Sequence, residues 1–201
     1  RDRLESFFIL SGEDTTLPYA ELKALIDTYA PSATINQYNR TLVTVSSRLD
    51  WETIMRRGAY IRIGGLVLGN FDIHRVQSEV RGIISEKLSL EFRSFAVRSH
   101  DTSGHRGFNS LVNDIGHIVK EEFPKSVVNL ESPEVVFIAM VHGNEVLLGI
   151  TLRGSQSARW YPRRPRAKPF FHPSALYPKF ARALVNLARV REGELIMDPF
   201  C

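Results

Sequence analysis

The residues of this sequence best suited to chemistry lie in a tract from Arg153 to Lys168, called the basic tract below, which interleaves cations with Trp160 and Tyr161. Guanidinium groups pair with phosphates through two parallel hydrogen bonds. An aromatic ring can stack on an unpaired base and contribute about 1–3 kcal/mol per base. The tract therefore indicates contact with RNA or DNA, which composition does not distinguish. The alternative is that Trp160 anchors a linker to the preceding domain.

The distribution of charge along the chain supports a polyanionic partner. From Arg153 to Arg191 there are ten Lys and Arg residues and no Asp or Glu. Residues 1–152 hold 16 basic and 19 acidic side chains, whereas residues 153–201 hold 10 and 3. Basic segments bind nucleic acids because their contacts with phosphates release counterions. A solvated, flexible basic linker is the simpler alternative.

A second candidate contact is the loop from Ser99 to Arg106, which contains His100, Asp101 and His105. The spacing of these side chains matches no defined metal site, and no cysteine accompanies them. Arg98 and Arg106 bracket the loop, and the N-terminus of the helix expected after it attracts negative charge. We therefore predict an edge that faces an anion and that binds no metal.

Several classes of protein are excluded by composition. Cys201 is the sole cysteine, so no internal disulfide framework or four-cysteine zinc site is possible. No apolar run approaches the roughly 20 residues that span a bilayer, and residues 1–5 show no signal-peptide pattern. The motifs GxSxG, HExxH, CxxC and the P-loop are absent. We expect a soluble, cytoplasmic protein without a complete catalytic constellation in these residues.

The elements that position these residues begin with a βαββαβ unit over residues 6–70. Strands are predicted at 7–10, 34–38, 41–45 and 60–68, and helices at 17–29 and from Asp50 to Arg57. Thr15 or Thr16 is the predicted cap of the first helix, and Asn39-Arg40 a two-residue hairpin turn. Gly64, Gly65 and Gly69 indicate bulges or close packing. This order is typical of a split-βαβ, ferredoxin-like α+β domain.

A second α/β unit is predicted from residue 72 to 154. Helical spacing of apolar residues covers 73–88 and 108–119, and a strand is expected at 92–97. The apolar runs 135–141 and 146–152 flank His142-Gly143-Asn144-Glu145, which favours a hairpin turn. Their near-continuous apolarity predicts central strands covered on both faces.

Residues 155–201 differ in character from both units. Six of the ten prolines lie between 162 and 199, so an extended connector is predicted through residue 173. A helix follows over 176–190, with Pro178 in its first turn and Gly193 at its exit, and then an apolar strand over 193–201. Such a strand begins an open α/β domain, so we expect the front part of a longer protein. Without the remaining sheet, four leucines are expected to be exposed: Leu176, Leu184, Leu187 and Leu195.

Two C-terminal stretches resemble a known family. Residues 166–188, RAKPFFHPSALYPKFARALVNLA, and residues 193–201, GELIMDPFC, resemble the opening of the methyltransferase domain in archaeal tRNA guanosine N2-methyltransferases that act at tRNA position ten. Residues 95–116, 132–136 and 149–152 look like a THUMP domain. The βαββαβ unit is similar to the ferredoxin-like domain that accompanies THUMP in tRNA-modifying enzymes. The resemblance covers nearly the whole chain.

The resemblance implies a domain order. It gives a ferredoxin-like domain at 1–71, a THUMP RNA-binding domain at 72–154, a basic proline-rich linker at 155–173, and the first helix and strand of a Rossmann-like methyltransferase domain at 174–201. The first two domains would grip the acceptor stem and 3′ end of tRNA. The residues assigned to RNA, from physics and resemblance together, are Arg98, His100, Arg106, Arg153, Arg159, Trp160, Arg163, Arg164, Arg166 and Lys168.

The resemblance also implies S-adenosylmethionine as the cofactor of the parent protein, which we expect to be a monomer. The catalytic Asp-Pro-Pro-Tyr segment of the family has no counterpart among these residues. No catalytic residue is therefore assigned, and we expect the 201 residues alone to be inactive. The residues that would lie beside the cofactor, or at the strand end that faces it, are Phe170, Phe171, His172, Ser174, Asp198, Pro199 and Phe200.

Two other functions stay open at this point. The first is the THUMP module of another tRNA-modifying enzyme, such as a 4-thiouridine synthetase. That enzyme should carry a Ser-Gly-Gly-type pyrophosphate loop after THUMP, where this chain has Met197-Asp198-Pro199. The second is a non-enzymatic protein whose basic tract binds an acidic surface, which predicts no preference for tRNA over other polyanions.

Overall fold

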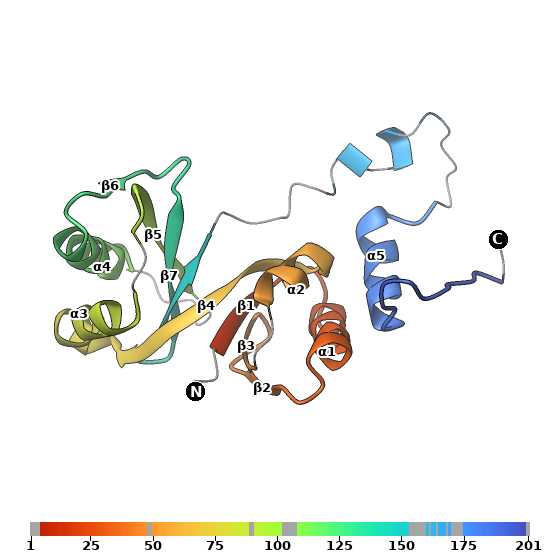
Figure 1. Ribbon diagram of the computed structural model, residues 1–201, viewed down its shortest axis with the longest axis horizontal. Coiled ribbons are helices and arrows are strands. Elements are labelled where there is room, and N and C mark those ends of the chain that lie inside the picture. The colour runs from red at the N-terminus through yellow and green to blue at the C-terminus, as the bar shows by residue number, and fades with distance from the viewer. Residues whose placement is uncertain are drawn as a thin grey trace. The chain divides into compact units, whose positions relative to one another are not determined.

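The structure is a computed structural model that describes residues 5–47, 50–88, 91–101, 108–152, 160, 162–163, 165–167, 169 and 175–199 (Figure 1). Its contacts divide the chain into two compact units. The first unit comprises residues 8–64 and the described part of 155–201, and the second comprises residues 65–154 with 5–7, as far as they are described. The chain therefore leaves the first unit and later returns to it.

The first unit has the predicted βαββαβ order: β1 (Glu5–Leu10), α1 (Leu17–Tyr29), β2 (Thr34–Gln37), β3 (Leu42–Ser46), α2 (Trp51–Arg57) and β4 (Ile61–Asp72). The strands lie side by side in the order β2-β3-β1-β4, and β2 is antiparallel to β3. One buried cluster fills the space between sheet and helices. It contains Phe8, Leu10, Leu22, Leu25, Ile26, Val43, Val45, Ile54, Met55 and Ile61.

Two local predictions in this unit need correction. The side chain of Thr16 makes no capping hydrogen bond at α1; Asp14 Oδ1 accepts from the backbone N–H groups of Thr16 and Leu17 at 2.8 and 2.7 Å instead. The hairpin turn is longer than two residues, because Gln37 pairs with Val43 and the Asn39 carboxamide accepts from the N–H of Leu42 at 3.0 Å. The predicted cap of α2 by Asp50 is confirmed.

The second unit contains η1 (Ile73–Arg75), α3 (Val76–Lys87), β5 (Ser94–Asp101), α4 (Asn109–Glu122), β6 (Val127–Val128), β7 (Val135–His142) and β8 (Glu145–Thr151). Its strand order is β4-β8-β7-β5-β6, with β5 parallel to β6 and β7, and β8 antiparallel to its neighbours. The predicted hairpin and the central position of β7 and β8 are confirmed. Gly143 takes a φ of 61° in the turn.

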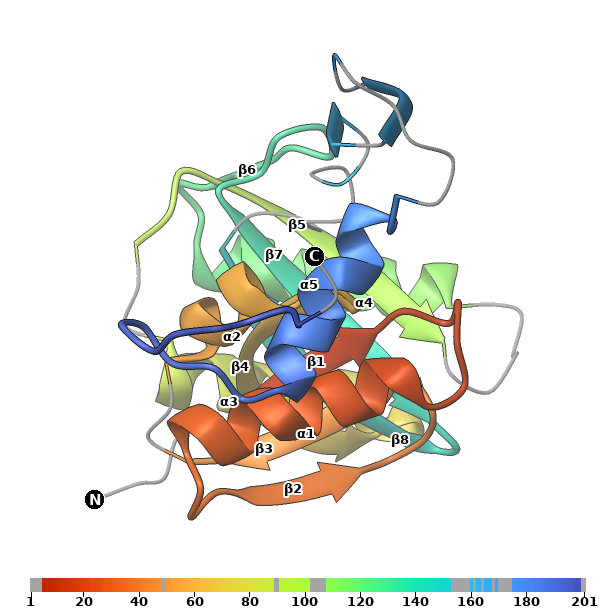
Figure 2. The same ribbon diagram turned by 90° about the vertical axis from the view of Figure 1, so that its right-hand side faces the viewer.

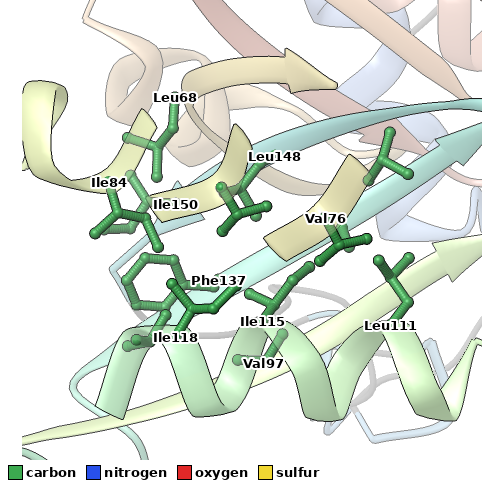
Figure 3. Close-up of a cluster of buried hydrophobic side chains, with 14 of the residues drawn as sticks. Leu68, Val76, Ile84, Val97, Leu111, Ile115, Ile118, Phe137, Leu148 and Ile150 are labelled. Carbon is green, nitrogen blue, oxygen red and sulfur yellow. The ribbon is translucent and has the colours of Figure 1, made fainter. Parts of the chain in front are cut away.

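The core of the second unit lies between this sheet and the packed helices α3 and α4. Figure 3 shows Ile84 of α3, Ile115 and Ile118 of α4, and Phe137 of β7 pointing into one cluster. The predicted close packing of glycines is also confirmed, since a Cβ on Gly65 would lie 2.2 Å from the carbonyl oxygen of Ile150. A bulge interrupts the β4–β8 register between Val67 and Gly69.

The last segment departs most from prediction. A short turn, η3 (Pro165–Ala167), precedes α5 (Pro178–Leu187). Pro178 lies in the first turn of α5 as predicted, but the helix begins two residues later and ends three residues earlier than predicted. The residue with a positive φ just beyond the helix is Arg189, at 56°, whereas Gly193 lies six residues after the helix end and does not form its exit.

The predicted strand at 193–201 is not formed within its described part, residues 193–199, because no described strand lies beside it. The apolar side chains that follow α5 are accordingly exposed, and Leu195 is fully so. Leu176 and Leu184 are exposed as predicted, whereas Leu187 is half-buried. In the part of the chain that the structure describes, no helix is long and apolar enough to cross a membrane.

Candidate nucleic-acid interface and cofactor segment

Helix α5 lies beside α1 in the first unit (Figures 1 and 2). Three of its side chains, Lys179, Ala183 and Asn186, are buried. Residues spaced four and three apart lie on one face of a helix, so these three side chains form the face of α5 that contacts the rest of the first unit. Leu184 is exposed and lies outside this face. The helix predicted to open a new domain is therefore packed against the βαββαβ unit.

A buried carboxylate fixes the position of α5. Glu21 of α1 is fully buried, and its two oxygens accept from the backbone N–H groups of Ala59 and Tyr60 at 2.7 and 2.8 Å. The side-chain amide of Asn186 donates to the same carboxylate at 2.6 Å and to the carbonyl of Arg57 at 2.9 Å. Since a buried charge is costly unless it is hydrogen-bonded, this network stabilises α5 in one register.

Charged side chains flank this network along and beyond α5. Lys179 Nζ lies 2.7 Å from both carboxylate oxygens of Glu13 and 4.4 Å from the centre of the Tyr60 ring. Beyond the helix, Arg189 pairs with Asp27 at 2.9 Å, and Arg191 donates to the carbonyl of Thr28 at 3.1 Å. Neither Glu21 nor Asn186 was predicted as a functional residue. The available signal was a glutamate within the apolar face of α1.

These contacts predict how acid affects the docking of α5. The hydrogen bond from Lys179 lowers the pKa of Glu13, and hydrogen bonds from Lys23 and then Arg189 lower the pKa of Asp27. When folding lowers the pKa of a carboxyl group, that group stabilises the folded state fully at a pH above the pKa that it has in the unfolded chain. That contribution is lost as the pH falls through the folded pKa.

We therefore expect α5 to loosen as the pH falls below about 4. Amide hydrogen exchange of residues 178–187, corrected for the intrinsic effect of pH, measures this loss of protection. The variant Lys179→Met should show a weaker dependence on pH, because it removes the partner of Glu13. Equal pH dependence in the two proteins would contradict the role of the Lys179–Glu13 pair.

The structure places Trp160 in a different setting from the one predicted for a base-stacking ring. Trp160 is 6% exposed and packs with Ala59, Tyr60 and Ala183. The guanidinium carbon of Arg163 lies 6.0 Å from the centre of its ring. A ring covered by these side chains is closed to a nucleobase. The anchoring alternative is favoured, although the anchor is the first unit and not the unit that precedes Trp160 in the chain.

The other residues assigned to RNA do not form one described site. Arg163 and Arg166 are exposed in the first unit. In the second unit, β5 carries His100, which is half-buried, and Arg98, which is exposed and donates to the carbonyl of Leu130 at 2.9 Å. The remaining assigned residues lie outside the described part of the chain. They are Arg106, Arg153, Arg159, Arg164 and Lys168.

The residues assigned to the cofactor are not brought together by the described structure. Asp198 and Pro199 are exposed and follow a segment that is not a strand, which differs from the predicted strand end. The described residues thus offer no built site against which S-adenosylmethionine can be fitted, and no chemical step is derived through it. The other assigned residues lie outside the described part. They are Phe170, Phe171, His172, Ser174 and Phe200.

Comparison with known proteins connects this chain to methyltransferases. Residues 165–201 match the family model of an RMKL-like methyltransferase domain. A tRNA (guanine(10)-N2)-dimethyltransferase of Methanocaldococcus jannaschii is 28% identical over 96% of this chain and 60% of its own length. One of the same name from Methanothermobacter thermautotrophicus is 29% identical over 98% of this chain and 58% of its own. The chain spans about three fifths of these relatives.

Solved structures show the likeness of the fold. TrmN from Thermus thermophilus superposes with a TM-score of 0.64 at 19% identity, over 92% of this chain and 54% of that one. A 4-thiouridine synthetase in complex with RNA and ATP gives a TM-score of 0.53 at 13% identity, over 76% and 42%. Both have the mixed α/β architecture described above. At such identities they establish the fold alone.

Proposed function

We propose that this chain is the tRNA-binding portion of an S-adenosylmethionine-dependent tRNA guanine-N2 methyltransferase acting on guanosine 10. The observation that carries the proposal is the similarity to two relatives of that name over 96% and 98% of the chain. The basic segment from Arg153 to Arg191, which contains no Asp or Glu, supports an RNA partner independently, because contacts between Lys or Arg and phosphates release counterions.

The domain assignments belong to this proposal. Residues 1–71 form a ferredoxin-like domain, to which the strand order β2-β3-β1-β4 and two helices are suited. Residues 72–154 form the THUMP domain, residues 155–173 the linker, and residues 174–201 the start of the methyltransferase domain. The first two domains hold the acceptor stem and 3′ end of tRNA, so that the target guanine reaches a catalytic domain that follows.

In this proposal the described residues bind and orient RNA. Exposed Arg98, Arg163 and Arg166 contact phosphates, while buried Trp160 holds Arg163 in place through its ring. S-adenosylmethionine supplies the methyl group in the whole protein, and the segments 170–174 and 198–200 contribute to its site there. A THUMP module of a 4-thiouridine synthetase is the second candidate, supported by the fold likeness. The methyltransferase match of residues 165–201 favours the first.

A titration tests the proposal. The chain is titrated with intact tRNA, with tRNA lacking its single-stranded 3′ end, and with duplex DNA, over a range of salt concentrations. We expect the chain to bind intact tRNA more tightly than the other two ligands. We also expect a plot of log K against log salt to fall with a slope of about −0.7 for each phosphate contacted on a single strand. No methyl transfer is expected from these residues alone. Equal affinity for the three ligands would refute recognition of tRNA, and a slope near zero would refute phosphate contact.

A further inference from the structure

We propose that Arg57, Arg163 and Arg182 form an anion site on the first unit that binds one phosphodiester of the RNA backbone. The inference rests on the proposed function for the identity of the ligand, and on the structure for the site. Arg57 and Arg182 were not predicted as RNA contacts, and they come from elements separated by 125 residues in sequence. The fold joins them.

The convergence of the three arginines follows from the docking of α5. Arg57 ends α2, and its carbonyl oxygen accepts from the side-chain amide of Asn186 at 2.9 Å. Arg182 stands four residues before Asn186 and therefore shares its face of α5. The next residue, Ala183, packs with Trp160, whose ring carries the guanidinium of Arg163 at 6.0 Å.

The guanidinium groups of these arginines lack anionic partners. Among the residues that the structure describes, none of the three makes an ion pair, although seven ion pairs are present elsewhere. The Nε atoms of Arg57 and Arg182 are buried without a hydrogen-bond partner. A buried donor without a partner costs about 1–3 kcal/mol, more when it is charged. Three cations gathered in this way are typical of a site that awaits an anion.

The nearby charges do not neutralise this cluster. Glu21 is the carboxyl group that raises the pKa of Arg182, but one carboxylate does not balance three guanidinium groups. Burial lowers the pKa of Arg182, and the positive charge of Arg57 and then of Arg163 lowers it further. The guanidinium group binds a phosphate through its terminal nitrogens, so a bound phosphodiester would offset the repulsion among the three cations. One terminal nitrogen of Arg57 already donates to the carbonyl of Val190 at 3.0 Å.

The first test measures RNA affinity. In the whole chain, Arg182→Gln is expected to weaken the binding of intact tRNA and to reduce the slope of log K against log salt by about 0.7–0.9, which corresponds to one lost phosphate. Arg56→Gln is the matched control, because Arg56 is an exposed arginine beside Arg57 that bonds Thr53 at 2.7 Å. The control should leave the slope unchanged. A slope that is also unchanged in Arg182→Gln would overturn the site and leave the proposed function intact.

The second test measures stability without RNA, using inorganic phosphate as the probe. At matched ionic strength, phosphate should raise the thermal midpoint of the parent chain above its value in chloride, and raise that of Arg182→Gln less. In chloride, Arg182→Gln should be at least as stable as the parent, since the substitution removes a repelled charge. A destabilised Arg182→Gln would show a structural arginine and overturn the site.

The two tests separate the site from the function. Phosphate could stabilise the chain through Arg182 while Arg182→Gln leaves the salt slope of tRNA binding unchanged. That combination would identify a site for free anions and overturn the assignment to RNA. Failure of the parent chain to bind tRNA would overturn the proposed function. In that case, a stabilisation by phosphate that is weaker in Arg182→Gln would still support the anion site. An equal stabilisation of the two proteins would overturn the anion site as well.

Discussion

Replacing Glu21 by alanine is expected to lower the free energy of unfolding by about 3–5 kcal/mol, because three buried donors lose the carboxylate that they share. The substitution removes the carboxylate that accepts from the N–H groups of Ala59 and Tyr60, and it leaves the amide of Asn186 with the carbonyl of Arg57 alone. Each unsatisfied buried donor costs about 1–3 kcal/mol. The loss should appear in urea denaturation and in the exchange of α5 amides.

Two variants sharpen this result. Glu21→Gln keeps the shape and one acceptor oxygen, so it should lose clearly less stability than Glu21→Ala. Glu86→Ala removes an exposed glutamate from the helix α3 and should change stability by no more than about 0.5 kcal/mol. If Glu21→Ala behaved like Glu86→Ala, the network would not hold α5.

Phe137→Ala should have a comparable effect on the second unit. Phe137 in β7 is fully buried, and its ring meets those of Phe92 and Phe95 edge-on with centroids 5.9 and 6.2 Å away. Removing a large buried side chain leaves a cavity and costs about 3–5 kcal/mol. Urea denaturation followed by circular dichroism measures the loss.

The control for Phe137→Ala is Val127→Ala in the short strand β6, where the side chain is 57% exposed. That substitution should be nearly neutral. If the proposed function is right, Phe137→Ala should also weaken tRNA binding in proportion to the fraction unfolded and leave the salt slope of the folded protein unchanged. Loss of slope without loss of stability would show instead that the core substitution altered the RNA contact directly.

Sequence patterns predicted the elements of both units well, for a physical reason. Residues such as Leu22, Leu25 and Ile26 repeat with the period of a helix, and the runs in β7 and β8 are too apolar for any place but the middle of a sheet. The prediction was poor where few residues carry the signal. Strand β6 has two residues, both exposed, and periodicity does not detect such a strand.

The partner of α5 was unpredictable from the same patterns. Its buried face, Lys179, Ala183 and Asn186, is weakly apolar, and the opposite face carries Leu184. Hydrophobicity alone therefore indicates the wrong face of α5 as the one that packs against a partner. Trp160 was ambiguous for a related reason, since an aromatic among arginines suits a base-stacking site and a packing anchor equally. Only the three-dimensional arrangement distinguishes these roles.

The return of the chain to its first unit has a consequence for biosynthesis. Glu21 and Asn186 are 165 residues apart, with the whole second unit between them. At a synthesis rate of about 5–20 residues per second, Glu21 waits roughly 10–30 s for its partner. The first unit is therefore completed only after the second unit has been synthesised, and during this interval Glu21 lacks the cover that α5 later provides.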